Sequence, residues 1–320
     1  MPLQYDPEFT KVAGPVLEVI SSAPKIPAND VQALAASISS SYDPIMAAIP
    51  ALPDIEESTY TTTSYDGHPV PIIRVAPKQS NAPSSPGPAI VHAHFGGFVA
   101  GSAQKWSTMH HGPVLATGIP FFAVGYRLAT EKPFPAAAED VYAAVKWLQE
   151  HAAELNVDPA RIATMGMSAG GNLAAAVALM ARDRGLSPPL AKQILIYPAL
   201  DDRNTTPNPD IEPFSTWTCD NNITAWNAYL GEVGKDDVSP YAAPARATRF
   251  DALPPTYIDV GGVDMFRDES VAYAAEIMKA GINVELHVYP GVPHGFEAFG
   301  PGTGVCDRAQ ANRLAAMGAI

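Results

Sequence analysis

The fold is decided by the stretch MGMSAGGN at residues 165–172. It contains the pattern G-x-S-x-G around Ser168, after a β-rich run at 161–165 and before a helical pattern that starts at Leu173. A serine at such a strand-to-helix turn is typical of a nucleophile elbow, where its backbone is strained and its hydroxyl is exposed. Side chains at Gly166 or Gly170 would collide with the neighbouring strand and helix, so both positions favour glycine.

Short β-rich runs alternate with helical patterns along the rest of the chain. The expected strands are 59–65, 70–75, 89–94, 121–126, 161–165, 193–197, 256–260 and 284–289. Apolar stripes at helical spacing lie between several of them, for example Val141, Val145 and Leu148. This alternation predicts an α/β fold, with a mostly parallel eight-stranded sheet flanked by helices.

Two stretches interrupt the alternation and divide the chain into segments 1–50, 51–202, 203–245 and 246–320. The first stretch, 1–50, contains a predicted helix at 31–40, preceded by Asn29-Asp30 as helix caps. The second, 203–245, begins in a loop rich in Pro, Asn and Asp and continues with aromatic residues at loosely helical spacing. Long insertions of this kind favour a lid or a pocket wall over the core sheet. Alternatively, the aromatic residues only anchor the insertion to the core.

A pair of adjacent glycines marks the end of the third predicted strand, in the run HFGGF at 94–98. Adjacent glycines allow two backbone N–H groups to point into one cavity, as an oxyanion hole requires. We therefore expect Gly96 and Gly97 to be donors. Ala169, the residue after the serine, supplies a third N–H group.

An acid and a base follow the serine at the ends of two later strands. Asp264 comes just after the strand at 256–260, and His294 just after the strand at 284–289. Loops at the carboxyl edge of a parallel sheet converge in space, so Ser168, Asp264 and His294 can meet. The hydroxyl needs a base, and the imidazole needs a carboxylate to hold its tautomer. The neighbouring acids 268–269 are better placed at the start of a helix, where they suit its dipole.

These motifs resemble those of the α/β-hydrolase superfamily, and specifically of the hormone-sensitive-lipase-like carboxylesterases. HFGGF at 94–98 is similar to the family's H-G-G-G-F, and GMSAGGN at 166–172 to its G-D-S-A-G-G-N. DMFRDE at 264–269 resembles D-P-L-R-D-E, and HGF at 294–296 also fits. YRLA at 126–129 with FPA at 134–136 resembles Y-R-L-A-P-E-x-x-F-P-A. The match covers 58–200 and 246–320, and the two divergent stretches correspond to the helical cap of such enzymes.

The resemblance implies an α/β-hydrolase fold with Ser168, Asp264 and His294 as the triad and Gly96, Gly97 and Ala169 as oxyanion donors. The chain departs from the family pattern twice, because Phe95 replaces a glycine and Met167 replaces an acidic or small residue. Phe95 should therefore keep a negative φ, and its ring can border the pocket. The expected pocket residues are Phe95, Phe98, Met167, Trp217 and Trp226.

Charge and composition exclude several classes of protein. With 20 Lys and Arg against 33 Asp and Glu, the formal net charge is −13, which excludes a generic nucleic-acid binder. No apolar run approaches the roughly 20 residues needed to span a bilayer, and no signal peptide is visible, so the expected location is cytoplasmic. The two cysteines are expected to be reduced thiols.

No metal or cofactor is expected. His92 and His94 stand two apart on one strand and could share a zinc ion, but no third ligand is evident. The pair His110-His111 is expected to be solvated.

The sequence therefore predicts a serine carboxylesterase that hydrolyses short- to medium-chain esters through an acyl-enzyme. Its expected partner is a small-molecule ester, and a monomer or a homodimer is expected. Two alternatives stay open. The same triad can serve a specialised reaction, such as lactone or amide cleavage, acyl transfer or cyclisation. The fold can also serve as a non-catalytic small-molecule binder.

Overall fold

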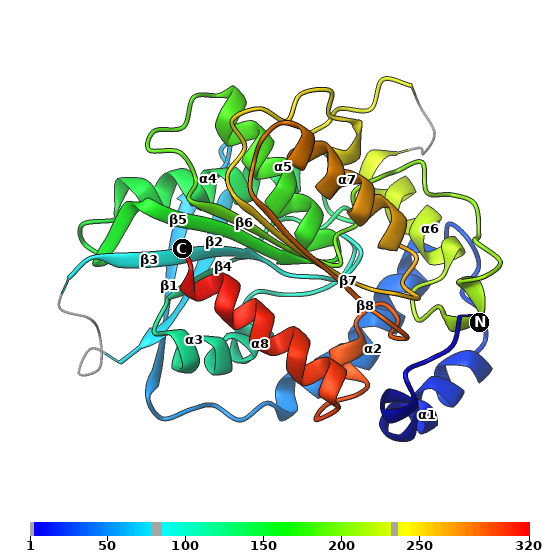
Figure 1. The fold of residues 1–320 in the computed structure, drawn as a ribbon. Helices are drawn as coiled ribbons and strands as arrows, with labels where there is room; N and C mark the ends of the chain where they lie inside the picture. Colours follow the sequence, from blue (N-terminus) through cyan, green and yellow to red (C-terminus); the bar gives the residue numbers. More distant parts are fainter. Residues whose placement is uncertain (1–2, 79–84, 232–235) are drawn as a thin grey trace.

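An eight-stranded sheet organises the computed structural model, which describes residues 3–78, 85–231 and 236–320 (Figure 1). The strands are β1 (Ile55–Thr63), β2 (Pro69–Pro77), β3 (Gly87–Ala93), β4 (Phe121–Val124), β5 (Val157–Met167), β6 (Lys192–Ile196), β7 (Thr256–Gly261) and β8 (Val284–Tyr289). Their order in the sheet is β1-β2-β4-β3-β5-β6-β7-β8. The pairs β1–β2 and β2–β4 are antiparallel and the other five are parallel. The predicted α/β fold with a mostly parallel eight-stranded sheet is confirmed.

Helices cover both faces of this sheet. The helices are α1 (Pro7–Ser22), α2 (Val31–Ala48), α3 (His111–Thr117), α4 (Ala136–Glu150), α5 (Ala169–Asp183), α6 (Cys219–Leu230), α7 (Arg267–Lys279) and α8 (Gly304–Gly318). In Figure 1, α4, α5 and α7 lie on one face, and α3 and α8 lie on the other. The layers follow from the alternation of strand and helix in the chain, since each parallel connection must cross a face of the sheet.

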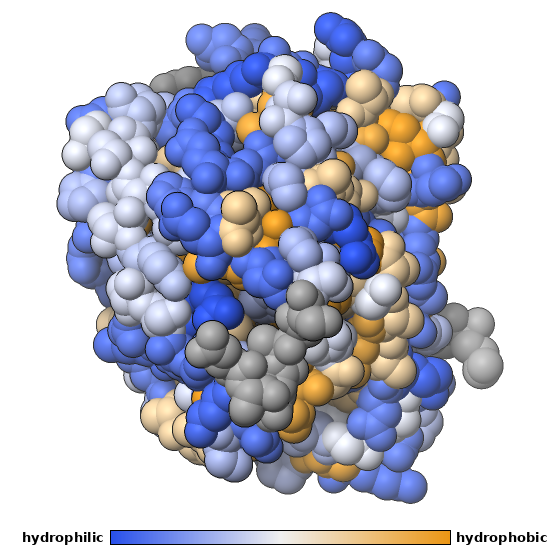
Figure 2. Space-filling model, turned by 90° about the vertical axis from the view of Figure 1, so that its left-hand side faces the viewer, coloured by the Kyte–Doolittle hydropathy of each residue, from blue (hydrophilic) through white to orange (hydrophobic). Residues whose placement is uncertain are grey.

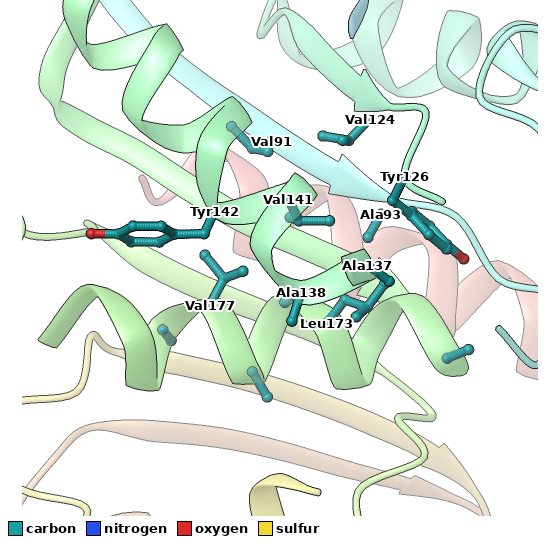
Figure 3. Packing of buried hydrophobic residues seen from close by; sticks show 14 of the residues in the cluster. Val91, Ala93, Val124, Tyr126, Ala137, Ala138, Val141, Tyr142, Leu173 and Val177 are labelled. Atoms are coloured by element: carbon teal, nitrogen blue, oxygen red, sulfur yellow. The ribbon is translucent and has the colours of Figure 1, made fainter. Parts of the chain in front are cut away.

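The two faces of the central strand β3 build two separate cores. Ala89 and Val91 pack toward α4 and α5, whereas Ile90 packs with the core that includes α3 and α8. Figure 3 shows Val141 of α4 and Leu173 of α5 among the side chains between these helices and the sheet. Strands buried on both faces have no solvated side, so they read as near-continuous apolar runs.

The N-terminal stretch is more helical than the sequence predicts. The predicted helix at 31–40 is observed as α2, which begins after its cap Asp30 but continues through Pro44 to Ala48. Propensity alone would end the helix before proline, but the last turn is held by tertiary packing, with Met46 buried. Helix α1 was not predicted. Asp6 caps it by accepting from the backbone N–H groups of its first turn.

The two divergent stretches meet at the carboxyl edge of the parallel strands (Figure 1). The backbone N–H of Asn29 donates to Thr224 Oγ1 of α6 at 2.9 Å. Tyr5 Oη donates to the Phe214 carbonyl at 3.0 Å. The regular helix of the insertion begins only at Cys219, so Phe214, which ends the short 3-10 helix η3 (Glu212–Phe214), and Trp217 both come before it.

The opposite side of the molecule, where β3 and β5 begin, is mostly hydrophilic with smaller apolar areas (Figure 2). Within the described ranges, no helix is both long enough and apolar enough to cross a membrane.

Candidate active site

Ser168 occupies a strained turn between β5 and α5. Its φ and ψ are 55° and −120°, a conformation that L-residues rarely adopt. A Cβ on Gly166 would overlap the Gly170 carbonyl, and a Cβ on Gly170 would overlap the Ala93 carbonyl of β3. The two glycines therefore allow the close approach of strand and helix that holds the serine in this turn, as their positions in the sequence predicted.

The sheet edge brings Ser168, His294 and Asp264 into one hydrogen-bonded line. His294 Nε2 lies 2.9 Å from Ser168 Oγ, and His294 Nδ1 lies 2.8 Å from Asp264 Oδ2. A carboxylate only accepts, so the Nδ1 proton faces Asp264 and Nε2 is left to accept the serine proton. The side chain of Asp264 is fully buried, and its Oδ1 accepts from the Phe266 N–H at 2.9 Å. The arrangement can activate a serine nucleophile.

The two neighbouring acids have other partners. Asp268 is exposed and pairs with Arg267 at 2.7 Å. Glu269 is buried, and its carboxylate accepts from the Leu200 N–H at 2.6 Å and from Asn204 Nδ2 at 2.8 Å. Burial raises the pKa of Glu269 well above its usual value despite these donors. Glu269 thus ties the start of the insertion to α7.

The predicted oxyanion donors belong to the loop after β3 and to the start of α5. Gly96 and Gly97 have φ values of 122° and 58°, which suit glycine. Their N–H groups donate no hydrogen bond within the described part of the chain. Ala169 is the first residue of α5, where N–H groups have no acceptor inside the helix. No described acceptor competes for these three groups, and their role as oxyanion donors stays a prediction.

Aromatic side chains surround the imidazole of His294. Tyr197 and Phe266 pack their rings against it edge-on, with centroid distances of 4.7 and 5.0 Å. Trp217 lies 6.4 Å from the same ring, and a Cβ on Gly97 would lie 2.6 Å from the end of its indole. The insertion loop is also fixed to the site, because Thr216 Oγ1 donates to the His294 carbonyl at 2.7 Å.

The other expected pocket residues differ in their surroundings. Phe95 is buried, stacks on Trp106 at 4.5 Å and has no positive φ, as expected. Met167 is half-buried beside Ser168. Phe98 and Trp226 are buried against each other, with ring centroids 5.4 Å apart. Contact of these residues with a substrate stays a prediction.

A buried charge network behind the site was not predicted. Arg313 of α8 donates to both oxygens of Asp259, at 2.7 and 3.0 Å, and to Glu297 at 2.8 Å. Tyr197 Oη donates to the same Glu297 oxygen at 2.6 Å. Burial raises the pKa of Glu297, but the Arg313 charge and the Tyr197 hydrogen bond outweigh it, so the net shift is downward. No local motif marks these residues, because they meet only in the folded chain.

The prediction that His110 and His111 are solvated is wrong. Both are buried, because η2 (Ser107–His110) and α3 pack onto the sheet. The ring of His110 lies 4.4 Å from that of His92 and stacks on Phe121 at 4.8 Å. Burial, followed by the neighbouring histidines, lowers the pKa of His110 to about 3. His111 Nε2 lies 2.7 Å from Glu57 Oε1.

His94 lies in a different environment from His92. Its ring stacks on Tyr126 at 4.2 Å, and its Nδ1 lies 2.7 Å from the Phe95 carbonyl. Burial lowers its pKa to about 4. Among the described residues, no group of three His, Cys, Asp or Glu side chains is arranged to hold a metal ion.

Comparison with known proteins agrees with this geometry. A model of the alpha/beta hydrolase fold matches residues 90–298. Esterase LipI of Mycobacterium tuberculosis is 34% identical over 224 residues, 66% of each chain. Ethyl acetate hydrolase of Pseudomonas putida is 33% identical over 246 residues, 76% of each chain. The solved structure of a bacterial heroin esterase is similar along 98% of this chain and 97% of its own, with 35% identity and a TM-score of 0.88.

Proposed function

Because the chain belongs to the alpha/beta hydrolase family, in its hormone-sensitive-lipase-like branch, we propose that it hydrolyses carboxylic esters through an acyl-enzyme on Ser168. The enzyme class follows from relatives that are named esterases. The observation that carries the assignment to this serine is the line of hydrogen bonds from Ser168 through His294 to Asp264.

The reaction takes two steps. Ser168 Oγ attacks the ester carbonyl while His294 Nε2 takes its proton, and the N–H groups of Gly96, Gly97 and Ala169 stabilise the oxyanion. His294 then gives the proton to the alkoxide oxygen, and the alcohol leaves. In the second step His294 takes a proton from water, the hydroxide attacks the acyl carbon, and the acid is released as Ser168 recovers its proton. Asp264 stabilises the imidazolium in both steps.

Residues 1–50 and 203–245 together form the cap in this proposal, which favours short to medium acyl chains. Two observations support it. Asn29 and Thr224 join the two segments by a hydrogen bond. Trp217 lies directly over Gly97 and limits the space beside the oxyanion donors. The expected cytoplasmic location and the monomeric or dimeric state stay predictions, which cell fractionation and light scattering test.

The test is hydrolysis of a p-nitrophenyl ester ladder, from acetate to a long acyl chain, by wild type and Ser168→Ala. We expect the wild-type rate to be highest on an ester with a short or medium acyl chain. In Ser168→Ala the rate should fall by several orders of magnitude. Ser58→Ala on β1 is the control, because its hydroxyl makes no hydrogen bond within the described chain. Equal rates for wild type and Ser168→Ala would disprove the assignment of the nucleophile.

A further inference from the structure

Tyr42 of α2 lies between the two loops that carry the proposed chemistry. Its ring packs edge-on against Phe95, the residue before Gly96, with centroids 4.8 Å apart. On the other side, a Cβ on Gly295 would lie 3.3 Å from Tyr42 Oη, and Gly295 directly follows His294. A residue 126 positions before the nucleophile therefore borders both the oxyanion loop and the loop of the base.

The position of Tyr42 is fixed by its neighbour in the helix. Asp43 Oδ1 accepts from Trp106 Nε1 at 2.9 Å, and Trp106 in turn stacks on Phe95. Thr108 Oγ1 donates to the Met46 carbonyl at 3.2 Å, which ties the last turn of α2 to the same region. A side chain held in this way offers its polar group to a ligand at low entropic cost.

The hydroxyl of Tyr42 has no assigned task inside the protein. It makes no hydrogen bond with any residue that the structure describes. Burial, and then the charge of Glu297, raise the pKa of this hydroxyl, so it stays a protonated donor. Glu297 has one buried oxygen, Oε2, that also lacks a partner among the described residues, while its Oε1 is held by Tyr197 and Arg313.

The chemistry of the site indicates which part of the ester these groups face. His294 must deliver its proton to the oxygen of the leaving alcohol, so the alcohol part of the ester lies against the loop that carries His294. Tyr42 and Glu297 border that loop. The alcohol side thus presents a free hydroxyl donor, whereas an all-apolar wall would be expected for a plain alkyl alcohol.

We propose that Tyr42 is a specificity-determining residue that donates a hydrogen bond to a hydroxyl group on the alcohol part of the ester. The substrate class is then a monoester of a small diol or polyol. Its free hydroxyl accepts from Tyr42. This inference rests on the proposed function, because it places the alcohol by the role of His294.

The test compares two acetates whose alcohols have the same number of non-hydrogen atoms, propyl acetate and 2-hydroxyethyl acetate. Tyr42→Phe keeps the ring that packs on Phe95 and removes only the hydroxyl. We expect kcat/KM on 2-hydroxyethyl acetate to fall by about 3- to 10-fold, the range for one lost neutral hydrogen bond. On propyl acetate the change should stay below about 2-fold. Comparing variants on each ester removes the difference in intrinsic reactivity between the two alcohols.

The matched control is Tyr60→Phe on strand β1, whose ring packs on Trp147 at the far end of the sheet order. It should change neither rate. The inference is overturned if wild type hydrolyses both esters and Tyr42→Phe either lowers kcat/KM equally on both or changes it on neither. A different result, in which wild type hydrolyses no ester or Ser168→Ala matches it, refutes the proposed function itself.

Discussion

Acid should destabilise this protein through its buried histidines, and His110 offers the cleanest test. Its folded pKa of about 3 lies far below the unfolded value of about 6.5. Between pH 7 and 5 the unfolded chain therefore binds a proton at this residue that the folded chain does not. Stability rises with pH wherever the unfolded state binds more protons, so acidification lowers it in this window.

The magnitude follows from the separation of the two pKa values. One pKa unit corresponds to about 1.4 kcal/mol, and the unfolded histidine is almost fully protonated at pH 5. His110 alone should thus lower the free energy of unfolding by about 2 kcal/mol between pH 7 and 5. His94, with a folded pKa of about 4, should lower it by a similar amount. Against a total stability of roughly 5–15 kcal/mol, such a loss is large.

Urea unfolding at pH 7, 6 and 5 measures the effect in wild type and in His110→Phe, which keeps a planar ring against Phe121. Between pH 7 and 5, the free energy of unfolding should fall by about 2 kcal/mol less in the variant than in wild type. Only the difference between the proteins is diagnostic, because Glu269 has a raised pKa and stabilises the folded state as pH falls. His68→Gln is the control, since His68 is exposed. An unchanged slope in His110→Phe would refute the reasoning.

Two further changes test the scaffold. Gly170→Ala would push a Cβ into the Ala93 carbonyl, so we expect a loss of about 1–3 kcal/mol or more in a thermal melt, together with a strong loss of ester hydrolysis as Ser168 moves. Arg313→Leu would leave the buried Asp259 and the half-buried Glu297 without their cation, and urea unfolding should show a loss of about 3–5 kcal/mol. Stability equal to wild type in either variant would contradict the packing described above.

Local patterns were enough to find the residues at the strand ends. Gly166 and Gly170 surround Ser168 in sequence, and the backbone they permit is a property of those few residues. Asp264 follows the buried strand β7 and His294 follows the neighbouring edge strand β8, so the parallel sheet fixed where they meet. The sequence could rank Asp264 above its neighbouring acids because Asp268 and Glu269 open a helix, and the structure gives both of them other partners.

What the sequence could not predict depends on contacts between distant segments. His110 reads as polar and exposed, and it is buried only because η2 and α3 pack against the sheet beside His92. Arg313 and Glu297 carry no motif, and the network needs α8 to lie against Asp259 of β7 and against the loop after β8 that carries Glu297. Tyr42 precedes a proline that signals a helix end, but its packing on Phe95 continues the helix into the site.

The order of the strands also bears on how the protein gains activity during synthesis. Ser168 leaves the ribosome well before His294, and the base is carried by the loop after β8, an edge strand whose only partner in the described sheet is β7. The nascent chain therefore carries an inert serine until this last strand docks. Recovery of hydrolysis in a refolding experiment would consequently time the docking of β8, and it would report on the completed sheet rather than on early collapse.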